Sequence, residues 1–472
     1  MSREVRLNIE SLKKEYKVSL DLDKQVRLTH SSGSTKSKLR LLPYSTSTKG
    51  NELKDDQAIV GNLVRNISDL NYKEFKKEEL FENVKENVIS DQKEKLVDII
   101  KEFFFDDNGQ LVLSHPMFFK YLNQAGNNEK KVAEFLAGVL VDENIQDKVL
   151  ESFEKKPKQV LLALLYDSMP DLMASNKSNK SNYFCMNSHI KNLFTEDLLF
   201  LLEDENLLVR YFYMMIIYYY FFYTTQIVLD LDRMFDNKTE AIYPVYFNVN
   251  WEKRSSSRDS YKQGWKMIQS KLPKLFSHIN CINMINHVEN DTYKQLNYDR
   301  LKEVVGKLSS KDHLDLANEF ENWKNEYENC LNDVNWEAKK PVPQNADENV
   351  VLKEVRSLFH SINYQFQHSG RKKASVQYYD GIFALAKEHF LKQSGPLGYT
   401  LNLTQEYLIL LTKLCIKDRE KILLKELFQQ LELRGVYFDR TSKKHVIELY
   451  ERLNILEKKS DSGDAQYVKY VL

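Results

Sequence analysis

Nineteen consecutive residues without a formal charge, between Arg210 and Asp230, constrain this chain more than any other feature. The stretch VRYFYMMIIYYYFFYTTQIVLDL is long enough to cross a bilayer, which takes about 20 apolar residues. Its chemistry opposes that interpretation, because six of the nineteen residues are tyrosines and Tyr218, Tyr219 and Tyr220 lie at the centre. Tyrosine prefers the membrane interface, where its hydroxyl stays hydrated. We therefore expect the central helix of an all-α domain, with no membrane contact.

A second alternative for this run is a platform on which nucleic acid bases stack. Such platforms usually expose a few aromatic side chains among lysines and arginines. The run contains no cation, so the platform is a weaker interpretation than a core helix that is apolar on all sides. In a core helix, the tyrosine hydroxyls need hydrogen-bonding partners from neighbouring segments.

The composition restricts the classes of function. A chain of 472 residues is expected to hold about two to four domains. Lys and Arg together number 68, and so do Asp and Glu, so no overall field draws the protein to DNA or lipid. The four cysteines lie far apart without a C-x-x-C pair, which argues against a zinc ribbon or a disulfide framework. The N-terminal residues lack an apolar signal-peptide core, so we expect a cytoplasmic protein.

Changes in composition and hydrophobic periodicity along the chain predict five regions. The first region holds six cations and no acid from Lys24 to Asn51. The clearest boundary is the polar segment around Pro343. The regions are a basic extended arm (1–55), an N-terminal helical region (56–173), a central helical domain with the aromatic helix (184–336), a helical connector with a basic loop (350–400) and a C-terminal module (401–472).

One run of the N-terminal helical region, KEKLVDIIKEFFF, shows clear helical periodicity. Leu96, Ile99, Ile100 and Phe103 have the spacing of one helix face. A face of this kind is the one that a globular protein buries.

The best-defined pattern lies in residues 401–472. TLNLTQEYLILLTKLC predicts a helix capped by Thr404, and LLKELFQQLELRG predicts a second helix that ends at Gly435. SKKHVIELYERLNIL predicts a third helix capped by Asp439 or Thr441, and LEKKSDSGDAQYVKYVL predicts two short strands around a turn. This order is typical of a winged helix-turn-helix. The predicted fold class is therefore mainly α, with a multi-helical N-terminal and central region followed by this module.

Local clusters of cations are the candidate nucleic-acid-binding residues, because the chain has no net charge to attract phosphate. The third helix begins with cations at the positive end of its dipole. Glu448 and Glu451 lie on the face opposite its apolar stripe and repel phosphate, so a protein-docking role stays open. The candidates are Arg440, Ser442, Lys443 and Lys444 in the third helix, Lys458 and Lys459 in the wing, Arg371, Lys372 and Lys373 in the basic loop, and Lys253, Arg254 and Arg258 after the aromatic helix.

A search for catalytic patterns gives little. The G-x-x-x-x-G-K-[ST], G-x-S-x-G and H-E-x-x-H motifs are absent. His278, Cys281 and His287 could bind a metal, but their spacing matches no standard zinc module. Asp230 and Asp232 form a D-x-D pair that could hold Mg²⁺, as in a nuclease. Core or surface roles are commoner for all of these residues, so we expect no enzyme activity, no metal and no cofactor.

Four segments, GYTLNLTQEYLILLTKL, RGVYFDRTS, ELYERLNILEKKSDSGDAQYV and FFYTTQIVLDLDRMF, together resemble the DptG (DndG) family. That family is a component of bacterial DNA phosphorothioation-dependent restriction systems. The resemblance implies a cytoplasmic subunit that works with DptF-like and DptH-like proteins, which supply the ATPase and DNA-processing activities. DptG carries no known catalytic motif, so the resemblance assigns no functional residue.

The expected function is a non-catalytic subunit that bridges these partner proteins and DNA, with contacts to the DNA backbone. Two alternatives stay open. One is a stand-alone winged-helix DNA-binding regulator, and the other is a nuclease with an unrecognised metal site.

Overall fold

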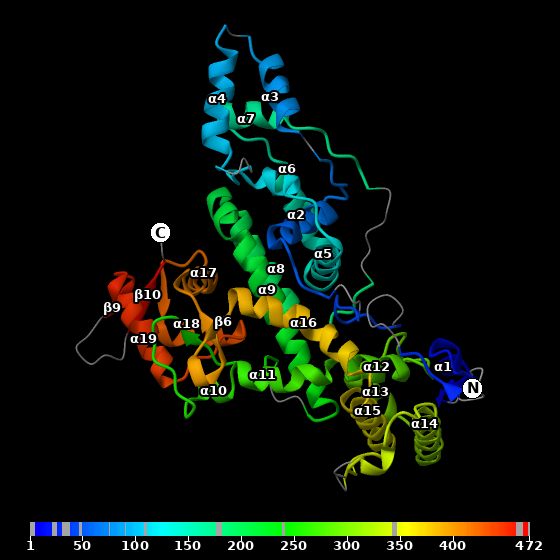
Figure 1. The fold of residues 1–472 in the computed structure, drawn as a ribbon. Helices are drawn as coiled ribbons and strands as arrows, with labels where there is room; N and C mark the ends of the chain where they lie inside the picture. The colour runs from blue at the N-terminus through cyan, green and yellow to red at the C-terminus, as the bar shows by residue number, and fades with distance from the viewer. Residues whose placement is uncertain are drawn as a thin grey trace. The chain divides into compact units, whose positions relative to one another are not determined.

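A computed structural model describes residues 5–20, 26–30, 38–46, 50–74, 76–89, 91–107, 111–175, 182–237, 241–341, 347–458 and 466–470 (Figure 1). Of these residues 61% are helical, so the predicted mainly α class is confirmed. The chain forms two compact units. Unit 1 comprises residues 1–52, 224–246 and 253–401, and unit 2 comprises residues 53–223, 247–252 and 402–472. The boundary between the units falls inside the predicted central domain of residues 184–336.

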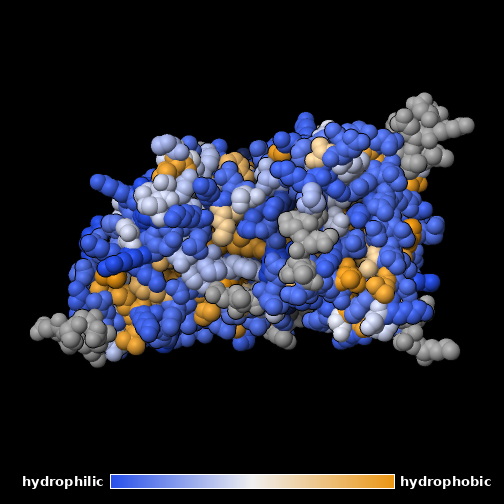
Figure 2. Space-filling view, turned by 90° about the horizontal axis from the view of Figure 1, so that it is seen from below, coloured by the Kyte–Doolittle hydropathy of each residue, from blue (hydrophilic) through white to orange (hydrophobic). Residues whose placement is uncertain are grey.

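The uncharged run forms α9 (Glu205–Arg233), a helix of 29 residues. Among the described residues it is the one helix long and apolar enough to cross a membrane, and 89% of its most apolar window is buried inside the protein. The side chains of Tyr218, Tyr219 and Tyr220 are 0–1% exposed. The predicted burial of this helix is confirmed. On the face shown in Figure 2, hydrophilic residues predominate and hydrophobic ones form scattered groups.

Unit 2 begins with a helical array in which α2 packs against α5, and α8 packs against both α5 and α6. Its helices before the C-terminal module are α2 (Asp56–Ile67), α3 (Lys77–Glu86), α4 (Lys93–Phe104), η1 (Pro116–Tyr121), α5 (Asn127–Leu140), α6 (Glu143–Glu154), α7 (Val160–Ser168), α8 (Ser188–Leu202) and the first part of α9.

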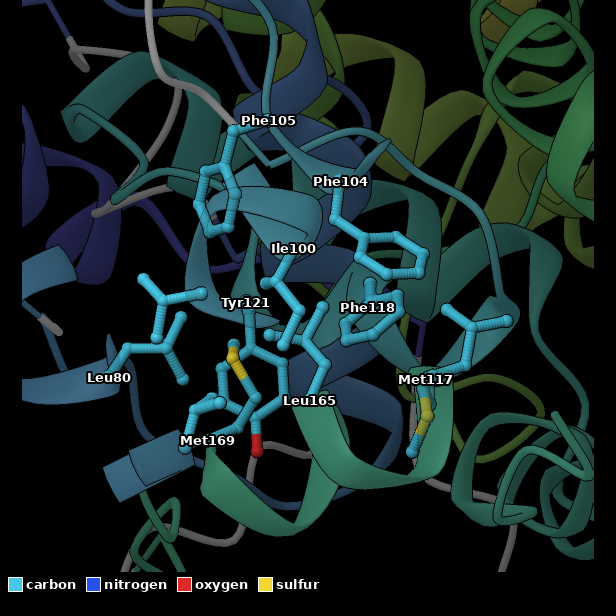
Figure 3. Close-up of a cluster of buried hydrophobic side chains, with 12 residues drawn as sticks. Leu80, Ile100, Phe104, Phe105, Met117, Phe118, Tyr121, Leu165 and Met169 are labelled. Atoms are coloured by element: carbon cyan, nitrogen blue, oxygen red, sulfur yellow. The ribbon is translucent and has the colours of Figure 1, made fainter. Parts of the chain in front are cut away.

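A separate group of buried apolar side chains lies where α3 packs against α4 and α7 (Figures 1 and 3). From α4 it receives Val97, Ile100 and Phe104. Ile99 and Phe103, expected on the same buried face as Ile100, are instead 40% and 66% exposed. The prediction is confirmed for Leu96 and Ile100 and wrong for Ile99 and Phe103. The reason is that α4 carries two adjacent apolar stripes, and periodicity alone does not tell which stripe meets the core.

Unit 1 is built around α12 (Leu275–Ile285), whose eleven residues are all buried. It packs against α15 and α16. The other elements are β1 (Arg6–Leu7), α1 (Ile9–Glu15), β2 (Ser19–Leu20), β3 (Val26–Arg27), α10 (Asp259–Lys262), α11 (Trp265–Lys271), η2 (Leu272–Lys274), β5 (Val288–Glu289), α13 (Tyr298–Val305), α14 (Ser310–Asn329), η3 (Trp336–Ala338), α15 (Val350–His368), α16 (Lys372–His389), β6 (Leu391–Gln393) and η4 (Gly395–Leu397).

The predicted basic arm of residues 1–55 is not extended in its described part. β1 pairs with β5, and the Tyr16 hydroxyl after α1 donates to the Asn280 carbonyl at 3.2 Å. Leu39, Leu41 and Leu42 are buried. These apolar residues tie the N-terminal segment to the body of unit 1, although the sequence around them is rich in cations. Lys24, Lys36 and Lys49 lie outside the described residues, as do positions 342–346 around the predicted boundary.

The C-terminal module of unit 2 contains three helices and a three-stranded antiparallel sheet. Its elements are α17 (Gln405–Ile416), β8 (Lys421–Leu423), α18 (Leu424–Leu433), α19 (Arg440–Arg452), β9 (Leu456–Lys458) and β10 (Gln466–Lys469), with the strands in the order β8-β10-β9. The predicted caps are confirmed: the Thr404 and Asp439 side chains accept hydrogen bonds from Tyr407 N at 3.3 Å and from Ser442 N at 2.9 Å.

Two strand pairings around this module were not predicted. β8 pairs with β10, and β4 (Asn248–Val249) pairs in parallel with Asn402 and Leu403 at the end of β7 (Tyr399–Leu403). Strands of two or three residues are too short to show alternation, so their partners rather than their sequences define them.

Gly435 controls the turn between α18 and α19. Its φ of +79° lies in the left-handed region, as expected for a residue just after a helix end. A Cβ atom at this position would lie 2.6 Å from Phe222 Cδ2 on α9. Conformation and packing therefore both require glycine.

Gly435→Ala is expected to lower the free energy of unfolding of unit 2 by about 2 to 5 kcal/mol, because it adds left-handed strain to overpacking. Urea denaturation followed by circular dichroism measures this loss. Gly370→Ala is the matched control, since an added Cβ meets no described atom within 4 Å there. Equal effects of the two substitutions would contradict the packing described for Gly435.

Candidate nucleic-acid interface

α19 carries the largest group of predicted nucleic-acid-binding residues. Its inner stripe, Val446, Leu449 and Tyr450, is 0–2% exposed and forms part of the core of the module. The Tyr450 hydroxyl lies 2.7 Å from Thr412 Oγ1, which fixes the rotation of α19 against α17. This rotation leaves the side chain of Arg440 exposed at the start of the helix.

Ser442 does not belong to an exposed surface. Its side chain is fully buried, and its hydroxyl donates to Glu252 Oε1 at 2.9 Å. The same Glu252 oxygen accepts the backbone N–H of Val249 at 2.9 Å. The segment 247–252 therefore covers this side of the first turn of α19. The Ser442 hydroxyl is therefore not on the surface where the sequence placed it, because a segment distant in sequence buries it.

Lys443 points back toward α18. Its Nζ lies 3.3 Å from Glu432 Oε1 and 5.1 Å from the centre of the Phe428 ring. An ammonium group held by a carboxylate and an aromatic face is less available to phosphate than a free lysine. The structure thus gives Lys443 a role in joining α19 to α18.

Two ion pairs lie on the outer face of α19. The Lys444 side chain is 78% exposed, and its Nζ lies 4.0 Å from Glu448. Lys458 on β9 lies 2.6 Å from Glu451. Surface pairs of this kind contribute little to stability, but the acids lower the local positive potential. Lys459 lies outside the described residues.

The basic loop before α16 belongs to unit 1, and only part of it is exposed. Arg371 Nε donates to Gln365 Oε1 at 2.7 Å, and Nη2 lies 2.9 Å from Asp333 Oδ1. Arg371 therefore holds the loop against neighbouring segments. Lys372 and Lys373, in the first turn of α16, are exposed.

The segment after the aromatic helix contributes its cations from a folded loop of unit 1. Arg258 Nη1 donates to the Lys253 carbonyl at 2.8 Å, and Arg254 is half-buried. Trp265, which alternates with these cations in the sequence, is 1% exposed and stacks on Phe383. It cannot offer its face to a base.

A buried ion pair holds the C-terminal module in unit 2. Arg434 Nε and Nη2 donate to the two oxygens of Asp197 on α8, at 2.8 and 2.6 Å, and both side chains are 0–1% exposed. The Tyr219 hydroxyl of α9 donates to Asp197 Oδ2 at 2.7 Å, and the Tyr218 hydroxyl donates to the Arg434 carbonyl. Burial, together with the adjacent Asp197 carboxylate, raises the pKa of Tyr219 well above its usual value, so the hydroxyl remains a donor.

The sequence does not predict the Arg434–Asp197 pair, because its two members are 237 residues apart. The expectation that the tyrosine hydroxyls of the aromatic helix find partners is confirmed for Tyr218 and Tyr219. Tyr223 adds a third case, since its hydroxyl accepts the Met186 N–H at 2.9 Å.

Asp230 and Asp232 do not share a metal-binding position. Asp230 Oδ1 accepts the Tyr243 hydroxyl at 2.9 Å, whereas Asp232 binds Lys274 Nζ at 2.8 Å and also Lys271. Burial alone raises the pKa of Asp232, but the two lysines bring it below its usual value. Residues two apart on a helix point to different sides, so the D-x-D spacing does not gather the carboxylates on α9.

The predicted group of His278, Cys281 and His287 is also separated. His278 Nδ1 lies 2.9 Å from the Tyr298 hydroxyl, whereas His287 Nε2 lies 2.9 Å from Glu15 Oε2 on α1. Burial lowers the pKa of His278 to about 3 and raises the pKa of the Cys281 thiol to about 12. The two histidines therefore join helices within unit 1.

Comparison with known proteins adds no relative: no protein-family model and no curated protein matches the chain. The resemblance to the DptG family rests on the four quoted segments.

Asp197→Asn is expected to lower the free energy of unfolding by about 3 to 5 kcal/mol, because it leaves the buried Arg434 charge without a counter-charge. Glu196→Gln is the matched control. Its carboxylate is 64% exposed and pairs with Lys417 at 3.2 Å, so the loss should stay below about 1 kcal/mol. Urea denaturation of both variants checks the difference. Equal losses would mean that the buried pair is not the anchor.

His278 predicts a dependence of stability on pH. Its pKa is about 3 in the folded protein and 6.5 in an exposed histidine, so the unfolded chain binds the extra proton. This contribution to stability is fully present well above pH 6.5 and is lost as the pH falls through 6.5 toward 3, by roughly 1 kcal/mol at pH 5.5. His278→Phe should remove this part of the slope in denaturation curves measured between pH 7 and 5. An unchanged slope in the His278→Phe variant would contradict the burial of a neutral His278.

Proposed function

We propose that this protein is a non-catalytic subunit that bridges partner proteins and DNA, and that its C-terminal module is a winged helix-turn-helix. The observation that carries the proposal is the order of elements: helix, strand, two helices and two strands, with the sheet order β8-β10-β9. In domains built this way, the third helix is the one that enters the major groove. In this protein it corresponds to α19, and the strands β9 and β10 correspond to the wing.

Exposed cations at the start of α19 support a contact with the DNA backbone. Arg440 and Lys444 lie in its first turns, where the helix dipole adds a partial positive charge. Glu448 and Glu451 follow further along the helix, and their carboxylates reduce the positive potential there. Such contacts position a protein on DNA without reading its sequence, and they weaken as salt rises.

The biological setting of the proposal comes from the resemblance to the DptG family. On that basis the partners are DptF-like and DptH-like proteins of a phosphorothioation-dependent restriction complex, and the location is the cytoplasm. One packing contact supports treating the resembling segments together. Gly435, in RGVYFDRTS, lies against Phe222, in FFYTTQIVLDLDRMF, so two of the four segments meet at this point in unit 2.

A second candidate function for the module is docking on a protein instead of DNA. It is favoured by the ion pairs Lys444–Glu448 and Lys458–Glu451, because an ion-paired surface suits a polar protein interface better than it suits a polyanion. The burial of Ser442 by the segment 247–252 also favours protein docking, since it reduces the area of the first turn of α19 that DNA could contact.

The double variant Arg440→Glu and Lys444→Glu separates the two functions. If α19 contacts the backbone, binding of the full chain to a short duplex at 50 mM salt should weaken by about tenfold or more. The slope of log K against log salt should fall by about 2, equally for two unrelated duplex sequences. Fluorescence anisotropy measures both quantities.

Lys73→Glu with Lys148→Glu is the matched control, because both lysines are exposed in unit 2 outside the module. The control should bind like the wild type. Unchanged binding by the α19 variant would exclude α19 as the DNA surface and favour protein docking. Strong preference of the wild type for one of the two sequences would favour a regulator over a bridging subunit.

A further inference from the structure

An exposed apolar stripe on α4 has no role in the function proposed above. Ile99 and Phe103, one helical turn apart, are 40% and 66% exposed. Val112 is also 42% exposed, and its N–H donates to the Phe104 carbonyl at the end of α4 at 2.8 Å. A run of exposed large apolar side chains is uncommon on a surface in contact with water only.

The stripe lies on a rigid element. The opposite side of α4 is fixed by Ile100 and Phe104 in the buried group of Figure 3. Lys101 Nζ lies 5.1 Å from the Phe81 ring centre, which holds the flank of α4 against α3. The exposed position of Phe103 thus follows from the packing of the other face, and turning α4 to bury Phe103 would expose Phe104.

The charges beside the stripe differ in sign between its two ends. Lys95 is exposed one turn before Ile99, and Glu102 is exposed one turn after it. Glu94, at the basic end, is engaged by Lys85 at 2.8 Å. Asp106 and Asp107 follow at the acidic end. At 1.5 Å per residue, Lys95 and Glu102 are about 10 Å apart along the helix axis.

This pattern is complementary to itself when two copies lie antiparallel. A two-fold axis between positions 98 and 99 places Lys95 of each copy opposite Glu102 of the other, because each position then lies about 5 Å from the axis along the helix. Phe103 then packs on Leu96 and on the aliphatic stem of Lys95 of the second copy. The antiparallel arrangement also opposes the helix dipoles favourably, whereas a parallel arrangement places like charges together.

We propose that α4 is a self-association site, and that its occupant is α4 of a second copy of this chain. The contact is isologous, with Ile99 and Phe103 as apolar anchors and two Lys95–Glu102 ion pairs at its edges. A single helix pair buries less than the usual interface of about 800 Å² per partner, so the expected dissociation constant is on the order of 10 µM. Such a dimer would present two C-terminal modules, without depending on what those modules bind.

Sedimentation velocity of the full chain between about 1 and 100 µM tests the proposal. The mass should rise with concentration from 55.8 kDa toward twice that value. Phe103→Glu should weaken dimerisation by about tenfold or more, because it places a charge in the apolar seam. Val160→Glu is the matched control, since Val160 is an apolar residue of the neighbouring α7 that is 81% exposed. The control should dimerise like the wild type, and circular dichroism should show equal helix content in both variants.

A charge exchange tests the antiparallel arrangement itself. Lys95→Glu alone and Glu102→Lys alone should each weaken the dimer several-fold, because each places like charges together twice. The double variant should recover dimerisation to within about threefold of the wild type, since it reverses both partners of each pair. A wild-type chain that stays monomeric at 100 µM, or a Phe103→Glu variant that dimerises normally, overturns the proposal. Failure of the double variant to recover overturns the antiparallel pairing.

Discussion

The buried pair of Arg434 and Asp197 is the interaction on which the C-terminal module depends. Arg434 lies at the end of α18, directly before Gly435. The Asp197 carboxylate that binds its guanidinium therefore also fixes the turn that sets the direction of α19. Two tyrosines of α9 complete the network. In a dry interior, such a charge pair is stable only while both members and their remaining hydrogen bonds are present. The direction of the third helix is thus set from outside the module, by residues of α8 and α9.

This anchoring has consequences for function. The module keeps one helix face outward, and that face carries cations at its start and paired charges of both signs beyond. A surface of this kind provides modest, salt-dependent attraction to DNA and leaves room for protein contacts. Self-association through α4 would compensate for weak individual contacts, because linking two modest binding sites raises the overall affinity without any new contact at either site.

Several features of the candidate site followed from the sequence. Helix periodicity, the caps Thr404 and Asp439 and the stop at Gly435 are local properties, and all appear in the structure as expected. The burial of the aromatic helix followed from tyrosine chemistry. Ser442 shows where such reasoning ends. Its position in the first turn of α19 made it a candidate for phosphate contact. In the structure its hydroxyl instead donates a hydrogen bond to Glu252, which lies 190 residues away in sequence.

The sequence by itself therefore determined the three helices of the C-terminal module, where they begin and end, and that α9 lies inside the protein. Each of these properties depends on residues within a few turns of one another. Only the tertiary structure decided which of the two apolar stripes of α4 meets the core, which cations are used internally, and which carboxylate neutralises Arg434. Those choices depend on pairs of residues that are distant along the chain, and a periodic pattern does not contain that information.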